Sequence, residues 1–214
     1  FYGCSSLSDV SFSEAIRIIE EDAFGQCPAL TNIRTGKWLP GQGFLGLGNS
    51  TDITFLKEDG SVWLTLFYAD DWRRFTDIPA RDRLVHAFLR APGFIDFESY
   101  DTCLELLKYT EDQIDLALNR LLTPVGLSDA ARKQYEVFLS LHPYKTIDFI
   151  LKKNLPDAVL LLFEINFFTE EIITKAIHMA GLADNTPVLL VLMEYKNNRF
   201  GNIMPDDLFR IDLL

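Results

Sequence analysis

The hydrophobic positions of the chain follow a repeat of 23 residues at the N-terminus. Four pairs carry this repeat: Phe1 and Phe24, Cys4 and Cys27, Leu7 and Leu30, and Val10 and Ile33. Apolar residues that return in phase at a fixed period are typical of a solenoid, in which each period forms one turn of chain, here called a rung. Val10 and Phe12 alternate with polar neighbours, which predicts a short strand in each rung.

A hairpin is predicted after the rungs, where ITFLKEDGSVWLTLF alternates on both sides of Asp59-Gly60. Gly60 can supply the positive φ that a tight turn needs. Both faces of the second strand are apolar, so we expect both to be covered, because an exposed aromatic strip would instead be a binding surface. Before the hairpin, residues 36–48 hold five glycines and one proline, which predicts a loop. Its two G-x-G pairs lack the Lys-Ser/Thr and the helix of a phosphate-binding loop.

Helical spacing of apolar residues begins at Pro79 and continues through the rest of the chain. The longest apolar stretch, residues 155–195, contains two similar segments, DAVLLLFEIN and PVLLVLMEYKN, on either side of TEEIITKAIHMAG. A helix, a short loop and a helix, repeated in this way, predict stacked antiparallel helical hairpins. The expected N-caps are Thr110 (with Gln113 as a capping box), Ser128, Thr169, and Asn185 or Thr186.

These patterns predict an α+β protein that is mostly α-helical. We expect three regions: rungs with a truncated start in residues 1–36, a loop and β-hairpin acting as connector or cap in residues 37–78, and a helical-repeat domain in residues 79–214. Phe1 falls inside a repeat, so the N-terminus is expected to be a cut edge of a longer solenoid.

The rungs resemble the BspA-like surface-antigen class of bacterial leucine-rich repeats. The rung of that family reads roughly S-L-x-x-V-x-I-P-x-x-V-x-x-I-G-x-x-A-F-x-x-C, and the matching residues are Ser6, Leu7, Val10, Phe12, Ile16, Ile19, Ala23, Phe24 and Cys27. Ser13 replaces the family's proline and Glu20 its turn glycine, as in a degenerate terminal repeat. The resemblance covers residues 1–33 and implies a bacterial cell-surface or secreted protein that adheres or binds a host protein.

The C-terminal half resembles ankyrin-type helical hairpins. KTIDFILKKNLPDAVLLLFEIN has their short helix, polar loop and apolar second helix, although the T-P-L-H motif that begins an ankyrin unit is absent. Any antiparallel helical solenoid would share this pattern, so the resemblance implies stacked helical hairpins and no particular function.

Composition and charge narrow the possible partners. The chain has 48% hydrophobic residues, and its net charge of −11 is spread along it, with only residues 121–160 slightly basic. Nucleic acid and anionic membranes require a basic face, so both are disfavoured as partners. The apolar run from Ala158 to Phe168 contains Glu164 and Asn166 and is too short to span a bilayer, so no membrane insertion is predicted.

No catalytic, cofactor-binding or metal-binding residues are predicted. The three cysteines have no C-x-x-C spacing, and the three histidines have no His, Cys or Glu partner at ligand spacing. Asp70, Asp71 and Asp77 lack the alternate spacing of a calcium loop and are read with Arg73 and Arg74 as a paired surface charge run.

The sequence therefore favours a non-enzymatic scaffold that binds another protein, because solenoids present extended surfaces and little enclosed space. Two alternatives stay open. One is an enzyme whose site lies between the hairpin and the helices, around Trp63, Phe67, Tyr68 and Trp72. The other is a purely structural helical cap of a longer leucine-rich solenoid. A cytoplasmic location is the alternative to the cell surface, and neither the binding residues nor the oligomeric state can be read from the sequence.

Overall fold

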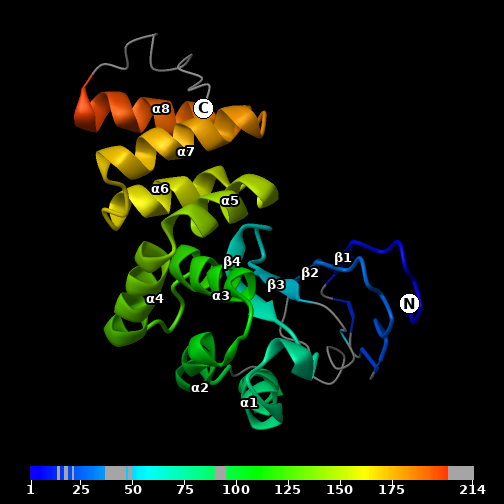
Figure 1. Ribbon diagram of the computed structural model, residues 1–214. Coiled ribbons are helices and arrows are strands. Elements are labelled where there is room, and N and C mark those ends of the chain that lie inside the picture. Colours follow the sequence, from blue (N-terminus) through cyan, green and yellow to red (C-terminus); the bar gives the residue numbers. More distant parts are fainter. Residues whose placement is uncertain are drawn as a thin grey trace. The chain divides into compact units, whose positions relative to one another are not determined.

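The computed structural model describes residues 1–13, 15–16, 19–20, 22–36, 47, 50–89 and 95–201. It confirms the mainly helical α+β class, and the chain divides into two compact units, Phe1–Tyr135 and Glu136–Leu214 (Figure 1). The two units meet between Tyr135 and Glu136, within the helix Asp129–Leu141. The sequence had instead suggested three regions, with boundaries after residues 36 and 78. Most of the loop predicted for residues 36–48, including both of its G-x-G pairs, lies outside the described residues.

In the described part of unit 1, a sheet has the strand order β1 (Asp9–Phe12), β2 (Asn32–Thr35), β3 (Thr51–Leu56) and β4 (Val62–Tyr68). The first three strands are parallel and β4 is antiparallel to β3. Val10 pairs with Ile33, so the register of β1 and β2 equals the 23-residue spacing in the sequence. The predicted hairpin is β3–β4, and it continues the sheet because Ile33 pairs with Ile53.

The helices of unit 1 lie on the β4 side of the sheet, where α3 packs on β4 (Figure 1). They are η2 (Trp72–Arg74), α1 (Ile78–Leu89), α2 (Phe97–Asp101), η3 (Thr102–Leu106) and α3 (Thr110–Leu122). The Thr123 hydroxyl after α3 accepts a hydrogen bond from the Thr65 amide at 3.0 Å, and the Tyr100 hydroxyl donates to the Phe67 carbonyl at 2.8 Å. The expected covering of β4 therefore holds from Leu64 onward but fails at the turn, where Val62 and Trp63 are exposed.

A buried polar cluster joins the helices of unit 1. The Arg120 guanidinium donates to both carboxylate oxygens of Asp101, at 2.7 and 3.2 Å, and the Tyr135 hydroxyl donates to the same carboxylate at 2.7 Å. The Phe97 ring lies 4.6 Å from the guanidinium carbon. Buried charges are tolerated only when they are paired in this way. Tyr135 comes from α4 (Asp129–Leu141), whose first turn is capped as predicted by Ser128.

Over its described residues, 136–201, unit 2 contains the end of α4 and the helices α5 (Pro143–Lys153), α6 (Pro156–Glu164), α7 (Glu170–Leu182) and α8 (Thr186–Phe200). Consecutive helices contact one another in the pairs α5–α6 and α7–α8, and α5 also contacts α7 while α6 contacts α8 (Figure 1). Asn154 and Asn166, which close the short turns after α5 and α6, have positive φ values of 51° and 56°. Their short polar side chains tolerate this left-handed conformation.

The capping predictions had mixed outcomes. Thr169 caps α7 and Asn185 caps α8, each by accepting a hydrogen bond from a first-turn amide. The capping box at Thr110 is wrong: α3 begins at Thr110 itself, and the Gln113 side chain donates instead to the Leu104 carbonyl at 2.9 Å. That contact links α3 to η3, a tertiary interaction that local spacing does not reveal.

Candidate functional site

The groups with the most strongly shifted pKa values lie in the core of unit 1. Burial raises the pKa of Tyr68, of Tyr100 and of Tyr135, and in Tyr135 the neighbouring Asp101 carboxylate adds to the effect. Burial also raises the pKa of the Cys103 thiol to about 12, so this thiol is neutral at physiological pH. A neutral, buried thiol is a poor nucleophile, and these groups serve packing and hydrogen bonding.

The four residues suggested for an enzyme site do not share one environment. Phe67 and Tyr68 are completely buried, whereas Trp63 and Trp72 are exposed. Trp63 lies near the hairpin turn, where its ring meets the edge of Phe55 with 6.4 Å between ring centroids. The structure thus separates the quartet into two core residues and two surface residues.

A hollow of about 430 Å³ lies on α1 and the start of α2, and it is lined by Pro79 and Ala87 together with five polar residues, Asp82, Arg83, His86, Asp96 and Ser99. Among them, Ser99 donates from its hydroxyl to the Asp96 carboxylate at 2.8 Å and from its amide at 3.1 Å. These bonds are the N-cap of α2, so Asp96 already has a structural role. Asp82 pairs with Arg81 at 2.8 Å, and His86 also lines the hollow.

The other sequence candidates have local partners. His142 lies at the end of α4 with its Nδ1 3.0 Å from the Phe138 carbonyl oxygen. Asp77 caps α1 by accepting from the Ala80 amide at 2.7 Å. Within the described part of the chain, no group of three or more His, Cys, Asp or Glu side chains could hold a metal ion.

A more distinctive feature is an exposed surface formed by Trp72, Arg73, Lys108 and Tyr109, called the Trp72 surface below. Trp72 is 57% exposed and Tyr109 is 53% exposed, although both are large aromatic residues. The Lys108 ammonium lies 5.8 Å from the centre of the Trp72 ring, within the range of a cation–π interaction.

Backbone hydrogen bonds hold the two segments of the Trp72 surface side by side. The Thr76 amide donates to the Leu106 carbonyl and the Lys108 amide donates to the Arg74 carbonyl, both at 2.8 Å. Phe75 and Leu107 form a β-bridge between these bonds, and both side chains are buried. The exposed aromatic residues are therefore attached to a fixed backbone rather than to a free loop.

Ion pairs complete this support. Arg73 forms a pair with Asp71 at 2.8 Å, and this contact raises the pKa of Arg73 and lowers the pKa of Asp71. Arg74 forms an ion pair with the mostly buried Asp112, in which its Nη1 donates to both carboxylate oxygens at 2.8 and 2.9 Å, and this pair ties η2 to the first turn of α3. Of the charged residues that the sequence suggested as a paired surface run, Arg73 and Asp71 do form a surface pair. Arg74 instead pairs with a mostly buried residue of α3.

The Trp72 surface combines Trp, Tyr and Arg, the three residue types most enriched at the energetic centres of protein interfaces. From the sequence, Trp72 was considered only as part of a possible enzyme site, and Tyr109 was not singled out. The available signal was an aromatic residue next to a basic one in Trp72-Arg73 and in Lys108-Tyr109, but their exposure and proximity depend on the pairing of residues 74–76 with residues 106–108.

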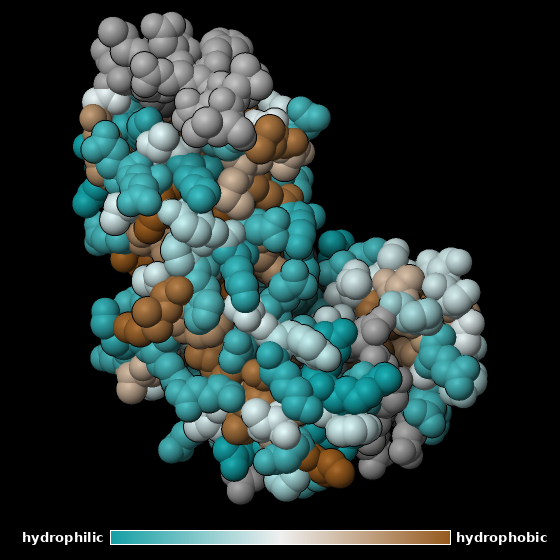
Figure 2. Space-filling view, in the orientation of Figure 1, coloured by the Kyte–Doolittle hydropathy of each residue, from teal (hydrophilic) through white to brown (hydrophobic). Residues whose placement is uncertain are grey.

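On the face of the molecule that Figure 2 draws, hydrophobic residues form small patches among hydrophilic ones. None of the described helices is both long enough and apolar enough to span a lipid bilayer. No protein-family model, characterised protein or solved structure gives a significant match to the chain.

Proposed function

We propose that this protein is a non-enzymatic scaffold that binds another protein, and that the Trp72 surface is its main contact site. The observation that carries this proposal is the exposure of Trp72 and Tyr109 on a backbone fixed by hydrogen bonds and by the Arg74–Asp112 pair. A backbone that is already fixed loses little conformational entropy on binding, so the apolar area that it presents contributes efficiently to affinity.

The proposal includes the architecture expected from the sequence. Residues 1–36 are interpreted as leucine-rich rungs of the BspA-like class, supported by the parallel register of Val10 and Ile33. Residues 143–200 are interpreted as two stacked ankyrin-like hairpins, α5–α6 and α7–α8, supported by the contacts of α5 with α7 and of α6 with α8. With these likenesses, the proposed setting is the bacterial cell surface or the extracellular medium, and the proposed role is adhesion.

A capping role for the helices of unit 1 is compatible with this function. Thr123 and Tyr100 bond to the Thr65 and Phe67 backbone, which protects that edge of the sheet from pairing with another chain. Deletion of residues 80–214 should then cause the remaining rungs to aggregate through the uncovered strand. A soluble, monomeric remainder would exclude the capping role and leave the binding proposal untouched.

The binding proposal is tested by site-specific photo-crosslinking. A photoreactive phenylalanine analogue is placed at position 72, at position 109, or at position 63 as an exposed control, and each protein is incubated with purified extracellular proteins and glycans. We expect protein adducts at positions 72 and 109 that disappear when unlabelled wild-type protein competes. Trp63 is a matched control because it is also an exposed tryptophan of unit 1.

Two variants measure the energetic contribution of the surface. Trp72→Ala and Tyr109→Ala should each weaken binding of the captured protein by about 2 kcal/mol, equivalent to roughly 30-fold in Kd. Trp63→Ala should change the Kd less than about threefold if it lies outside the interface. Equal crosslinking at all three positions, or equal losses in all three variants, would show that the Trp72 surface is not the contact site.

A further inference from the structure

The hollow on α1 and the start of α2 has walls that are already fixed. The Asp96 amide donates to the Ala87 carbonyl at 3.1 Å, which attaches the start of α2 to α1. The buried rings of Phe88 and Tyr100 also join the two helices, with 5.7 Å between centroids. The volume of about 430 Å³ lies in the range of roughly 300–1,000 Å³ that small-molecule sites occupy. The hollow can therefore accept a small ligand without rearrangement of the helices.

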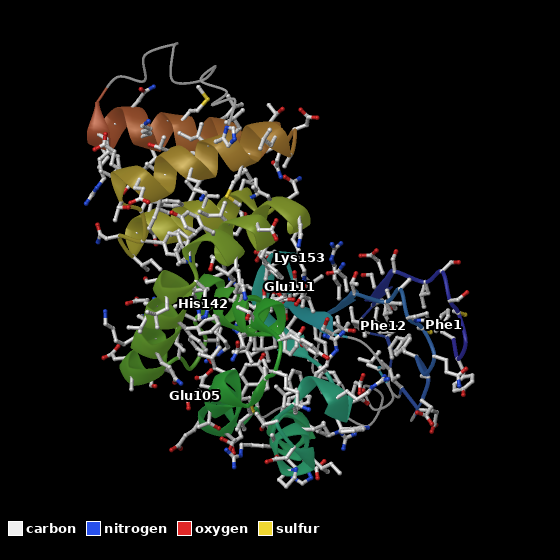
Figure 3. The ribbon with its side chains drawn as sticks, in the orientation of Figure 1. Phe1, Phe12, Glu105, Glu111, His142 and Lys153 are labelled. Carbon is white, nitrogen blue, oxygen red and sulfur yellow. The ribbon has the colours of Figure 1, made fainter. Side chains whose placement is uncertain are left out.

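The two carboxylates that line this hollow already have donors. Both oxygens of Asp96 accept from Ser99, at 3.1 Å from its amide and at 2.8 Å from its hydroxyl. One oxygen of Asp82 accepts from the Arg81 guanidinium at 2.8 Å. Glu105 on η3, labelled in Figure 3, does not line the hollow, and its carboxylate accepts from a side chain of α4 at 3.2 Å. The negative charge of the lining carboxylates is therefore compensated in part within the protein.

Arg83 and His86 give the hollow its available donors. They are one turn apart on α1, so their side chains lie on the same side of the helix, and both residues are exposed. Neither side chain forms a hydrogen bond or an ion pair within the part of the chain that the structure describes. The charge of Arg83 also reaches η3, because burial raises the pKa of the Cys103 thiol to about 12 and Arg83 counteracts part of this effect. A permanently charged donor and an imidazole thus line one hollow together.

We infer that this hollow binds a small organic anion, a carboxylate or a phosphate ester that also carries hydroxyl groups. The planar Arg83 guanidinium matches the oxygens of either anionic group, and the His86 imidazole donates to a further oxygen. A hydroxyl of the ligand donates to the second oxygen of Asp82 or to the oxygen of the Ser99 hydroxyl. The hollow shares no residue with the Trp72 surface, so this site is independent of the proposed scaffold function.

Other classes of ligand fit the hollow less well. Within the described residues, no group of three or more His, Cys, Asp or Glu side chains could hold a metal ion. The permanent charge of Arg83 would also repel any cation. A neutral polyol could bond to Asp82 and Ser99 but would leave the guanidinium without a counterion. An anion with hydroxyl groups is the class that uses all of these lining side chains.

Proton NMR of the full chain tests this site through the imidazole signals, and His86→Gln identifies the signal of His86. The probes are glycerol phosphate and glycerate at constant pH and ionic strength, and glycerol is the matched neutral control with the same carbon skeleton. We expect at least one of the two anions to shift the His86 signal with a Kd of about 1 mM, as for a small ligand with few contacts. Glycerol should leave the signal unchanged. The anion that binds more tightly shows whether the hollow prefers phosphate or carboxylate.

Substitutions of Arg83 test the source of the charge preference. Arg83→Met keeps the aliphatic stem without the guanidinium and should weaken binding at least about tenfold, as for the loss of a charge-assisted hydrogen bond. Arg83→Lys keeps the charge without the planar fork and should weaken binding about threefold. The matched control Arg34→Met removes an exposed arginine of β2 outside the hollow and should change the Kd less than about twofold. Circular dichroism verifies that each variant is folded, and Arg83→Lys alone decides if Arg83→Met is not.

Other results overturn the inference. If neither anion shifts the His86 signal at about 20 mM, the hollow does not bind an anion. If glycerol shifts the signal equally, the charge is not recognised, and if inorganic phosphate binds as tightly as glycerol phosphate, the hydroxyl groups are not recognised. If Arg83→Met and Arg34→Met weaken binding equally, the anion binds elsewhere. Failure of the crosslinking at Trp72 would change none of these readouts.

Discussion

The two units are stabilised in different ways. Unit 1 buries Asp101, Asp112 and Arg120 in its core, together with the phenols of Tyr100 and Tyr135. In the described part of unit 2, the buried polar residues are Thr146 and Lys196, and the remaining core is aliphatic and aromatic. Among the described residues of unit 2, the shortest distance between ring centroids is 3.6 Å, in the stack of Phe163 on Tyr195.

This difference determines how each unit responds to damage. A buried ion pair adds little net stability over an apolar core, but the loss of one partner leaves an unpaired charge in a low-dielectric interior. An apolar core loses stability roughly in proportion to the volume removed. Unit 1 should therefore depend on a few polar groups, and unit 2 on many small packing contributions.

Alkaline pH should produce the largest contrast between the units. Burial raises the pKa of Cys103 from 9 to about 12 and also raises those of Tyr68, Tyr100 and Tyr135. Below pH 9 these groups are neutral in both folded and unfolded chains and have no effect. Above it, the unfolded chain loses protons that the folded chain keeps, so the free energy of unfolding falls by about 1.4 kcal/mol per pH unit for each titrating group.

Tryptophan fluorescence measures this effect in unit 1 alone, because all three tryptophans lie within residues 1–135. We expect the fluorescence transition in urea to move to lower urea concentration between pH 9 and pH 11. The helical circular dichroism should fall only by the share of the unit 1 helices over this range, because α5 to α8 of unit 2 stay folded. If both signals disappear together near neutral pH, buried phenols do not distinguish the units.

Arg120→Ala is the most damaging substitution expected in unit 1. It leaves the Asp101 carboxylate buried without its bidentate partner, at a cost of about 3–5 kcal/mol in the free energy of unfolding. Urea denaturation followed by fluorescence measures the loss. As a control, Lys152→Ala breaks the exposed pair with Asp148 in unit 2 and should cost less than about 0.5 kcal/mol. Similar losses in both variants would contradict the role assigned to the buried cluster.

Leu162→Ala tests the apolar core of unit 2. Leu162 on α6 is completely buried, and its truncation should cost about 3 kcal/mol, depending on how far the cavity closes. Leu160→Ala on the same helix removes the same atoms from an exposed position and should cost less than about 0.5 kcal/mol. The loss should appear in the circular dichroism transition, and a larger shift in the fluorescence transition would show that the units do not unfold separately.

Thr169→Ala should have the smallest effect. The Thr169 hydroxyl accepts from the Ile172 amide at 3.2 Å at the exposed start of α7, and its removal should cost about 1 kcal/mol. Thr169→Ser keeps the acceptor and should retain most of the stability. Equal losses in the two variants would indicate that packing of the Thr169 methyl group, rather than capping, stabilises the helix start.

Helices and strands were predicted correctly where the turn or capping residues lie within the same short segment as the element. The Asp59-Gly60 turn produced the β3–β4 hairpin, with Gly60 at φ 81°, and Ser128, Thr169 and Asn185 cap the helices that follow them. In residues 97–108, where helical spacing was expected to continue, the structure has the short helix α2 followed by the 3-10 helix η3. In that segment the backbone returns to pair with residues 74–76, a contact that lies far away in the sequence.

The candidate surface could not be predicted from the sequence, because exposure is a property of packing. Trp63 and Phe67 occupy the same face of one alternating strand, yet Trp63 is exposed and Phe67 is buried. The difference arises because the helical side chains reach the strand from Thr65 onward. Tyr109 and Trp72 are 37 residues apart and become neighbours only through the bridge between Phe75 and Leu107.

The sequence by itself determined the α+β class, the hairpin, most helix starts and the 23-residue register of β1 on β2, because periodicity and capping are encoded in nearby residues. Tertiary structure alone decided that Arg120, Asp101 and Tyr135 meet in the core, and that Trp72 and Tyr109 share a surface. These groupings join residues from different elements, and they depend on which faces those elements bury against one another.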